Sequence, residues 1–208
     1  MSDDPTIGRA GQRRRGVERR QEILDRAIEV FQQRGADGTS LRRIAESLGV
    51  SHAALLHYFD SREQLLVAVY AHATAKRTEQ EASRGVQVEP GVEGMVAAAT
   101  ANVEVPGLVQ LYSTLVAAAL EADSTVGKHY FTTRFERIRA ELGDVFRAQQ
   151  AEGRIRADVS ADHLAALLIA ASDGLQIQWL LDASVGLSDT LRTFGKLLLP
   201  QPPATPAS

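Results

Sequence analysis

Cysteine is absent from the 208 residues of this chain, which excludes disulfides and thiolate-bound metal sites. Aromatic residues make up only 5% of the chain, whereas 44% is hydrophobic, so the core must consist mainly of alanine, leucine, valine and isoleucine. Such a core suits closely packed helices. Apolar runs of the roughly 18 residues that span a membrane are also missing, and the N-terminus is polar and basic. We therefore expect a cytoplasmic protein without a membrane partner.

Signatures of catalysis and metal binding are missing as well. The five histidines do not form the H-x-x-x-H or HExxH spacings of zinc sites, and the carboxylates lie on helical faces that read as solvated. The sequence also lacks a glycine-rich phosphate loop and a nucleophile elbow. We therefore expect that the protein is not an enzyme and holds no metal or cofactor.

The most informative stretch, residues 39–59, reads as two short helices joined by a tight turn. Thr39 or Ser40 is placed to cap the first helix, where a side-chain oxygen accepts a backbone N–H. Gly49 ends this helix, because glycine adopts the left-handed conformation at almost no cost. The helix between them is indicated by apolar residues at helical spacing, namely Leu41, Ile44, Ala45 and Leu48.

The second helix is expected to start at Ser51, and Leu55 and Phe59, four residues apart, are expected to point inward. Two helices joined by a short turn that contains glycine are typical of the helix-turn-helix, whose second helix enters the major groove of DNA. A helical corner inside any helical protein has the same pattern. The helix-turn-helix interpretation leaves five residues on the outside: Ser51, His52, Ala54, His57 and Tyr58.

The residues that follow favour the helix-turn-helix. Ser61 is placed to cap a new helix, with Gln64 as its capping-box partner. From Thr39 onward, the order Thr-Ser-Leu-x-x-Ile-Ala-x-x-Leu-Gly-Val-Ser leads to Leu55, Tyr58-Phe59, Ser61-Arg62-Glu63 and Leu65. This pattern resembles the DNA-binding domain of the tetracycline-repressor (TetR) family over residues 17–66.

One position departs from the family pattern. The family usually has a DNA-contacting Tyr at the position of Leu56, so the resemblance implies that phosphate contact here falls to Tyr58, His57 or their neighbours. Arg62 keeps the positive charge of the Lys that the family carries after its second helix.

Charge is distributed unevenly, although the net charge of the chain is −3. Residues 1–62 contain 11 Arg against 9 Asp and Glu, and residues 9–20 alone contain six Arg against one Glu. An acidic body is repelled by DNA while a basic end docks on it, so this distribution orients the protein. Residues 1–16 lack an apolar period and are predicted to form a flexible basic arm, either along the DNA or as a solvated tail.

The predicted DNA-binding domain spans residues 17–62. Its phosphate contacts are expected from Arg19, Arg20, Thr39, Tyr58 and Arg62, and its contacts to base edges from Ser51, His52 and Ala54. Ser40, Arg43 and His57 complete the predicted set.

The rest of the chain is also predicted to be helical, and no strand pattern of useful length occurs. Pro106 is expected both to stop one helix and to open the next, and Ser160 to cap another. We predict an all-α fold with a three-helix helix-turn-helix domain, a helical effector-binding and dimerisation domain over residues 63–199, and a disordered tail over residues 200–208. The predicted helices cover residues 17–34, 61–82, 92–105, 106–122, 127–152, 161–182 and 187–199.

The middle helices combine large apolar side chains with a few polar ones, as small-molecule pockets do. Aromatic residues at helical spacing also occur in an ordinary core, and that alternative stays open. TetR-like proteins hold an effector between these helices, so the resemblance implies a pocket without naming its ligand. The predicted pocket residues are Asn102, Gln110, Tyr112, Tyr130, Phe131, Phe135, Gln176 and Trp179.

The last two helices have more apolar surface than one domain can bury. Residues 164–169 are apolar on nearly all sides, which in a soluble protein indicates burial on two sides. We therefore expect a homodimer through a four-helix interface, and the family resemblance implies the same arrangement. The predicted interface residues are Leu164, Leu168, Leu175, Leu191, Phe194 and Leu198.

Together these patterns predict a homodimeric repressor that binds double-stranded operator DNA and is released from it by a small molecule. Two alternatives stay open at this stage. One is an activator or architectural DNA-binding protein without an effector, which a middle region without apolar volume would favour. The other is a small-molecule binding module whose helix-turn-helix is silent, and the Arg-rich N-terminus argues against it.

Overall fold

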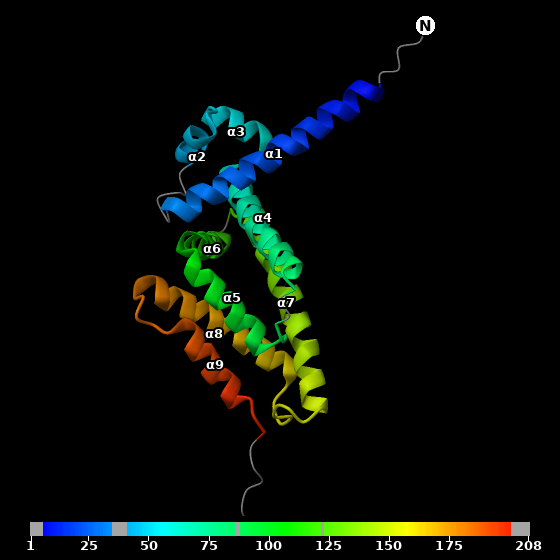
Figure 1. Cartoon of the computed structure of the whole chain (residues 1–208), viewed down its shortest axis with the longest axis vertical. Coiled ribbons are helices and arrows are strands. Elements are labelled where there is room, and N and C mark those ends of the chain that lie inside the picture. Colours follow the sequence, from blue (N-terminus) through cyan, green and yellow to red (C-terminus); the bar gives the residue numbers. More distant parts are fainter. Residues whose placement is uncertain (1–5, 35–40, 86–87, 122, 201–208) are drawn as a thin grey trace, which may run out of the picture. The chain divides into compact units, whose positions relative to one another are not determined.

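Every regular element described in the computed structural model is an α-helix, within residues 6–34, 41–85, 88–121 and 123–200 (Figure 1). The helices are α1 (Thr6–Arg34), α2 (Leu41–Leu48), α3 (His52–Tyr58), α4 (Arg62–Ser83), α5 (Val92–Glu104), α6 (Pro106–Ala119), α7 (Val126–Ala151), α8 (Ala161–Leu181) and α9 (Leu187–Leu197). The predicted all-α fold with an N-terminal helix-turn-helix is confirmed.

Most helix ends follow the local signals in the sequence. Pro106 opens α6, and Gly153, with a φ of +69°, follows the end of α7. Ser160 occupies the N-cap position of α8, but its side chain makes no capping hydrogen bond, so that detail of the prediction was wrong. The sequence therefore located the start of α8 correctly, although the expected capping hydrogen bond is not formed.

The N-terminal helix is longer than predicted. α1 begins at Thr6, so the start expected near Val17 was wrong, and the arm predicted to be flexible over residues 1–16 is helical from residue 6. Hydrophobic periodicity missed this segment because it has no apolar face. Arginine and glutamine are nevertheless good helix formers, and Arg14 pairs with Glu18 one turn later at 2.9 Å. Residues 1–5 of the arm and 201–208 of the tail lie outside the described residues.

Helix contacts divide the chain into two compact units. The first comprises Met1–Gly85 and Pro106–Lys128, and the second comprises Val86–Val105 and His129–Ser208. A compact unit is not necessarily a functional domain, so the predicted functional division after residue 62 stays a prediction.

The first unit is organised around α1, which contacts α2, α4 and α6, while α4 also contacts α6. An ionic clamp joins α1 to α4. Lys76 Nζ lies 2.8 Å and His72 Nε2 lies 3.0 Å from Asp25 Oδ1. The hydrogen bond that Lys76 donates holds the pKa of the Asp25 carboxyl below its ordinary value. The core of this unit includes Ile23, Ala27, Phe31, Leu65, Val69, Leu111 and Leu115.

The second unit has its own core, to which α5, α8 and α9 contribute together with the completely buried Phe146 of α7. α5 and α9 approach closely, since a Cβ on Gly195 would lie 3.1 Å from Val92 Cγ1. Gln150 supports the turn after α7 by donating hydrogen bonds to the carbonyls of Arg156 and Val159, at 2.9 and 2.8 Å.

α8 is unusually apolar for its position in this unit. Within the described residues it is long and apolar enough to cross a membrane by length and composition alone, yet only 28% of its most apolar stretch is buried. A core helix of a soluble protein meets the same criteria, so this finding is weak evidence for a membrane span. It does identify α8 as a helix with apolar surface left over.

Candidate nucleic-acid interface

The turn between α2 and α3 is a tightly hydrogen-bonded helix end. Gly49 has a φ of +64°, its N–H donates to the Glu46 carbonyl at 3.1 Å, and the Val50 N–H donates to the Ala45 carbonyl at 3.0 Å. This pair of bonds is the Schellman motif, which satisfies the last carbonyls of a helix. Any other residue at position 49 would be strained. The predicted glycine-ended helix is confirmed.

α3 is anchored at both ends of its short length. The Ser51 hydroxyl accepts a hydrogen bond from the Ala54 N–H at 3.1 Å and so caps the helix, as predicted. Leu55 and Phe59 are buried, also as predicted. The Arg20 guanidinium of α1 lies over the Phe59 ring, 4.7 Å from its centroid, which fixes the end of α3 against α1.

The outer face of α3 differs in part from the prediction. Ser51, His52 and His57 are exposed, whereas Ala54 and Tyr58 are half-buried, with Tyr58 packed edge-on against the His57 ring. Two further residues of the helix, Ala53 and Leu56, are exposed and were not in the predicted set. Ala53 could have been found, because it lies opposite Leu55 and Phe59 at 100° per residue.

The arginines predicted to contact phosphates lie on helices of the first unit. Arg43 of α2 and Arg62 of α4 are exposed, and Arg19 pairs with Glu22 at 2.6 Å on α1. Arg20 has a second function that the sequence did not indicate, because its guanidinium is stacked on Phe59. Thr39 and Ser40 lie outside the described residues.

The first turn of α4 is linked to the beginning of α7. The Ser61 hydroxyl accepts from the Gln64 N–H at 3.0 Å, while the Gln64 amide turns back to Asp60 rather than to the Ser61 N–H of a standard capping box. Glu63 Oε1 accepts from the Ser124 hydroxyl at 2.5 Å and from the Gly127 N–H at 2.9 Å. A Cβ on Gly127 would lie only 2.6 Å from the same oxygen, so any other residue there would displace the Glu63 carboxylate.

The eight predicted pocket residues are distributed over both compact units. Gln110 and Tyr112 are on α6 in the first unit, where Tyr112 stacks against Tyr70 with centroids 5.3 Å apart. The other six are in the second unit. There Asn102 Nδ2 donates to Gln176 Oε1 at 2.8 Å, which joins α5 to α8.

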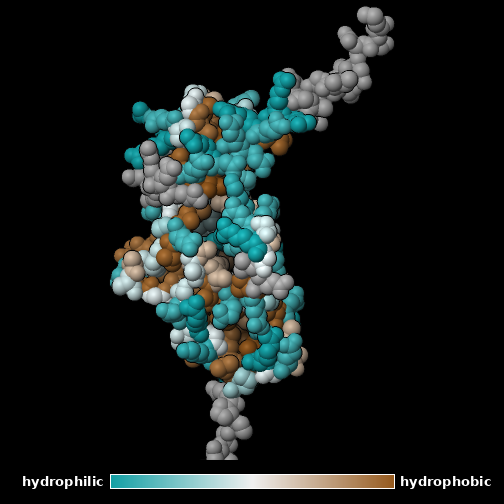
Figure 2. Space-filling model, viewed as in Figure 1, coloured by the Kyte–Doolittle hydropathy of each residue, from teal (hydrophilic) through white to brown (hydrophobic). Residues whose placement is uncertain are grey.

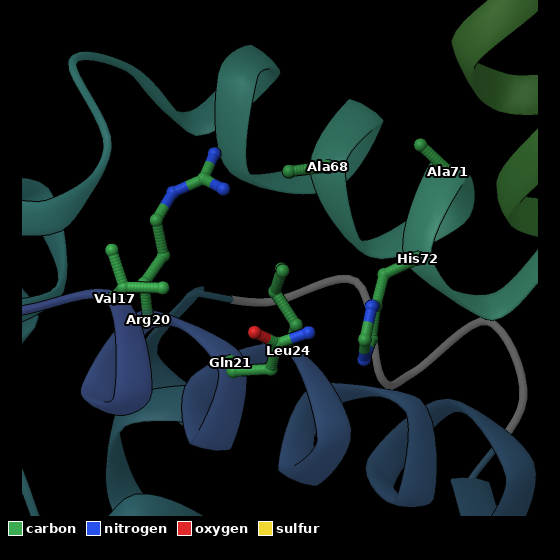
Figure 3. A pocket seen from close by; sticks show the side chains of 7 residues that line it. All are labelled: Val17, Arg20, Gln21, Leu24, Ala68, Ala71 and His72. Carbon is green, nitrogen blue, oxygen red and sulfur yellow. The ribbon is translucent and has the colours of Figure 1, made fainter. Parts of the chain in front are cut away.

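The aromatic members of the predicted set are only partly available to a ligand. Phe131 is buried, with Tyr130 and Phe135 at centroid distances of 5.1 and 6.4 Å along α7, and Trp179 of α8 is half-buried. An open pocket of about 410 Å³ lies elsewhere, between α1 and α4 of the first unit (Figure 3). None of the eight predicted residues is among its lining, which consists of Val17, Arg20, Gln21, Leu24, Ala68, Ala71 and His72.

The predicted dimer residues need correction. Leu164, Leu168, Leu191 and Leu198 are buried in the core of the second unit, and Leu175 and Phe194 are partly buried against that core. The first four side chains are therefore inaccessible to a second chain. The prediction failed here because α8 is apolar on all sides, so the period of the sequence does not distinguish its inner face from its outer face.

A different set of apolar residues faces outward on the same helices. Leu167, Ile177 and Leu181 of α8 are exposed, with Leu181 at 85%, and Leu197 of α9 is exposed as well. Figure 2 shows apolar surface reaching the outside where α8 turns into α9. On α8 these leucine and isoleucine side chains recur at a spacing that places them along one side of the helix.

Comparison with known proteins matches the N-terminal part of the chain most clearly. The family model of bacterial regulatory proteins, tetR family, matches residues 23–69. The chain is 37% identical over 68 residues to the HTH-type transcriptional repressor AcnR of Corynebacterium diphtheriae, which covers 33% of this chain and 36% of AcnR. The chain thus matches about a third of that relative's length.

Two longer matches extend over both units. A HTH-type transcriptional repressor of Mycobacterium tuberculosis is 28% identical over 159 residues, which covers 76% of this chain and 80% of the repressor. The crystal structure of a transcriptional regulator from Saccharomonospora viridis in complex with choline is similar with a TM-score of 0.66 and 21% identity, covering 87% of this chain and 95% of that one. The second similarity shows a shared fold.

Proposed function

Since this chain belongs to the TetR family of bacterial regulatory proteins, we propose that it is a homodimeric repressor that binds operator DNA and leaves it when a small molecule binds. The observation that carries the proposal is the outer face of α3, presented by a capped helix behind a tight glycine turn. A protein that acts on the bacterial chromosome works in the cytoplasm.

The proposal is tested by selecting bound DNA from a random pool with the full-length chain. A dimer with two α3 helices places them in successive major grooves, about 34–36 Å apart. We expect a pseudo-palindromic sequence whose half-sites have that spacing. Recovery of no preferred sequence at any salt concentration would contradict the proposal.

Arg62 and His52 are expected to contribute to DNA binding in different ways. Arg62→Ala should weaken binding to all sequences alike, because a phosphate contact carries no sequence information, and should reduce the slope of log K against log salt by about one unit per half-site, or about two units for the dimer. His52→Ala should instead relax the preference at one base pair of each half-site, because a contact to a base edge carries sequence information. Titrations of the selected operator and single-base variants across salt concentrations measure both effects.

Arg137→Ala is the matched control, since Arg137 is an exposed arginine of α7 in the second unit. It should leave both the salt slope and the base preference unchanged. A loss from Arg62→Ala that depends on DNA sequence would contradict its assignment to the phosphates.

The effector site is proposed for the second unit. The Asn102–Gln176 pair supports this placement, because it offers hydrogen-bonding groups among apolar helices, and Gln176 is buried. Phe131, Phe135 and Trp179 would supply apolar contact from α7 and α8. The related fold from Saccharomonospora viridis holds choline, which supports a small molecule as the ligand class.

We further propose that Glu63 couples the effector site to the DNA-binding helices. Its carboxylate joins the first turn of α4, beside Arg62, to the Gly127 N–H in the first turn of α7. From residue 129 onward, α7 belongs to the second unit and carries the aromatic residues of the proposed effector site. A shift of α7 would therefore move the start of α4.

Removing the Glu63 carboxylate should break this coupling. Coupling between two sites is reciprocal, so if α7 affects the DNA-binding helices, DNA binding must also affect α7. In the wild type, DNA binding should therefore change the rate of hydrogen exchange of the Gly127 amide, with a coupling free energy of about 1–3 kcal/mol. In Glu63→Ala, exchange at Gly127 should become fast and independent of DNA. The measurement is hydrogen exchange of the peptide around Gly127, with and without the selected operator.

Glu93→Ala is the matched control, because Glu93 is an exposed carboxylate in the first turn of another helix, α5. It should retain the DNA-dependent exchange of Gly127. DNA-dependent exchange that persists in Glu63→Ala would show that coupling takes another route.

A further inference from the structure

Helix α3, the proposed recognition helix, carries an unusual set of side chains for a DNA-binding element. α3 has the sequence His-Ala-Ala-Leu-Leu-His-Tyr and so contains no Arg, Lys, Asn or Gln. Arg and Lys form the paired hydrogen bonds that identify guanine, and Asn and Gln form those that identify adenine. The hydroxyl of Ser51, just before the helix, already accepts a bond from Ala54. Readout by two-pronged hydrogen bonding is therefore not available to α3.

What α3 exposes instead is a pair of apolar residues between two imidazole rings. Leu56 has 38% of its surface exposed, although its neighbour Leu55 is completely buried. Ala53, three residues before Leu56, is exposed on the same face, and the imidazoles of His52 and His57 flank the pair. The face thus consists of a small apolar surface between two polar rings.

Only one base has a matching group in the major groove. Thymine presents a C5-methyl there, and apolar side chains recognise it by direct contact. The surroundings also favour DNA as the occupant, since α3 carries no acidic residue and the exposed Arg43 and Arg62 lie on the adjacent helices α2 and α4. We propose that Leu56, together with Ala53, reads a thymine methyl in each operator half-site.

This inference rests on the proposed function, because it specifies what the same helix recognises. Burying one methyl group on Leu56 corresponds to about a three- to fivefold gain in affinity per half-site. For a dimer with two half-sites, the gains multiply to about ten- to twentyfold. Leu56 is therefore a specificity-determining residue rather than a source of most of the affinity.

The test replaces thymines of the selected operator with deoxyuridine, which removes the methyl and preserves base pairing. With the full-length wild type, one symmetric pair of replacements should weaken binding about ten- to twentyfold, while the other thymines tolerate the change. Leu56→Ala should bind the thymine and deoxyuridine operators about equally. Leu56→Met, which keeps an apolar side chain of similar size, should restore the preference for thymine.

Leu120→Ala is the matched control, because Leu120 is an exposed leucine in the turn after α6. It should keep the wild-type dependence on the methyl. Thermal unfolding of each variant checks that folding is intact. The comparison of thymine and deoxyuridine operators with the wild type does not depend on the folding of any variant.

The possible failures are distinguishable. If the wild type selects a preferred operator but tolerates deoxyuridine at every position, thymine reading by Leu56 is wrong and the proposed function stands. If the methyl dependence persists in Leu56→Ala, another residue reads the methyl and the assignment to Leu56 is wrong. If no sequence is selected from the pool, the proposed function and this inference both fail.

Discussion

Leu167→Asp is expected to yield a folded monomer, whereas the same substitution at the adjacent Leu168 is expected to prevent folding of the second unit. Leu167 is 54% exposed on α8, while Leu168 is completely buried in the core. We propose that the dimer forms through the exposed apolar side of α8, so at Leu167 the new carboxylate stays in water until two chains meet, and only this interface suffers. At Leu168 it would be buried without a partner, and this costs several kcal/mol on top of lost packing. A domain has only about 5–15 kcal/mol to lose.

Sedimentation measures the assembly state, and circular dichroism measures folding. Leu120→Asp is the matched control, because Leu120 is as exposed as Leu181 of α8, at 85% each, but lies in the other unit. It should leave the dimer intact, whereas Leu181→Asp should weaken it as Leu167→Asp does. A folded dimer in both α8 variants would move the interface away from this helix.

Loss of the dimer should also weaken DNA binding strongly. A monomer engages one half-site at a time, so it loses the roughly 10²–10⁴-fold gain that linked binding of two sites provides. Titration of the selected operator with Leu167→Asp should therefore resemble titration of an isolated half-site by the wild type.

Phe59→Ala is expected to unfold the first unit or to leave it barely stable. Phe59 is 1% exposed at the end of α3, and truncating a buried phenylalanine to alanine costs about 3–5 kcal/mol. The same change removes the ring on which Arg20 is stacked, a contact worth about 0.5–2 kcal/mol. Arg20→Ala should therefore destabilise the unit by the smaller amount only.

The chain provides an internal reporter for this experiment. Trp179 is the single tryptophan and lies in the second unit, so its fluorescence follows that unit alone. In Phe59→Ala, denaturant should reduce the helical circular dichroism signal before it changes tryptophan fluorescence. Leu56→Ala is the matched control on the same helix, and its unfolding should stay close to that of the wild type. If Phe59→Ala unfolded at the same denaturant concentration as the wild type, α3 would not be anchored through this ring.

Local signals in the sequence were enough to locate the helix-turn-helix. Gly49 and Ser51 act on backbone groups within a few residues of themselves, and Pro106 constrains its own φ, so their effects can be read from neighbouring letters. The inward direction of Leu55 and Phe59 also followed from the local sequence, because residues four apart lie on one face of a helix.

Which leucines of α8 are buried depends instead on the packing of the whole second unit. Leu167 and Leu168 are the same residue side by side, and α8 is apolar all round, so no period separates a core face from a free face. That choice depends on where α5 and α9 pack. The contacts of Arg20 with Phe59 and of Glu63 with Gly127 could not be read from the sequence either, because the partners are 39 and 64 residues apart in the chain, respectively. Caps and turns are local chemistry, whereas burial is a property of the whole fold.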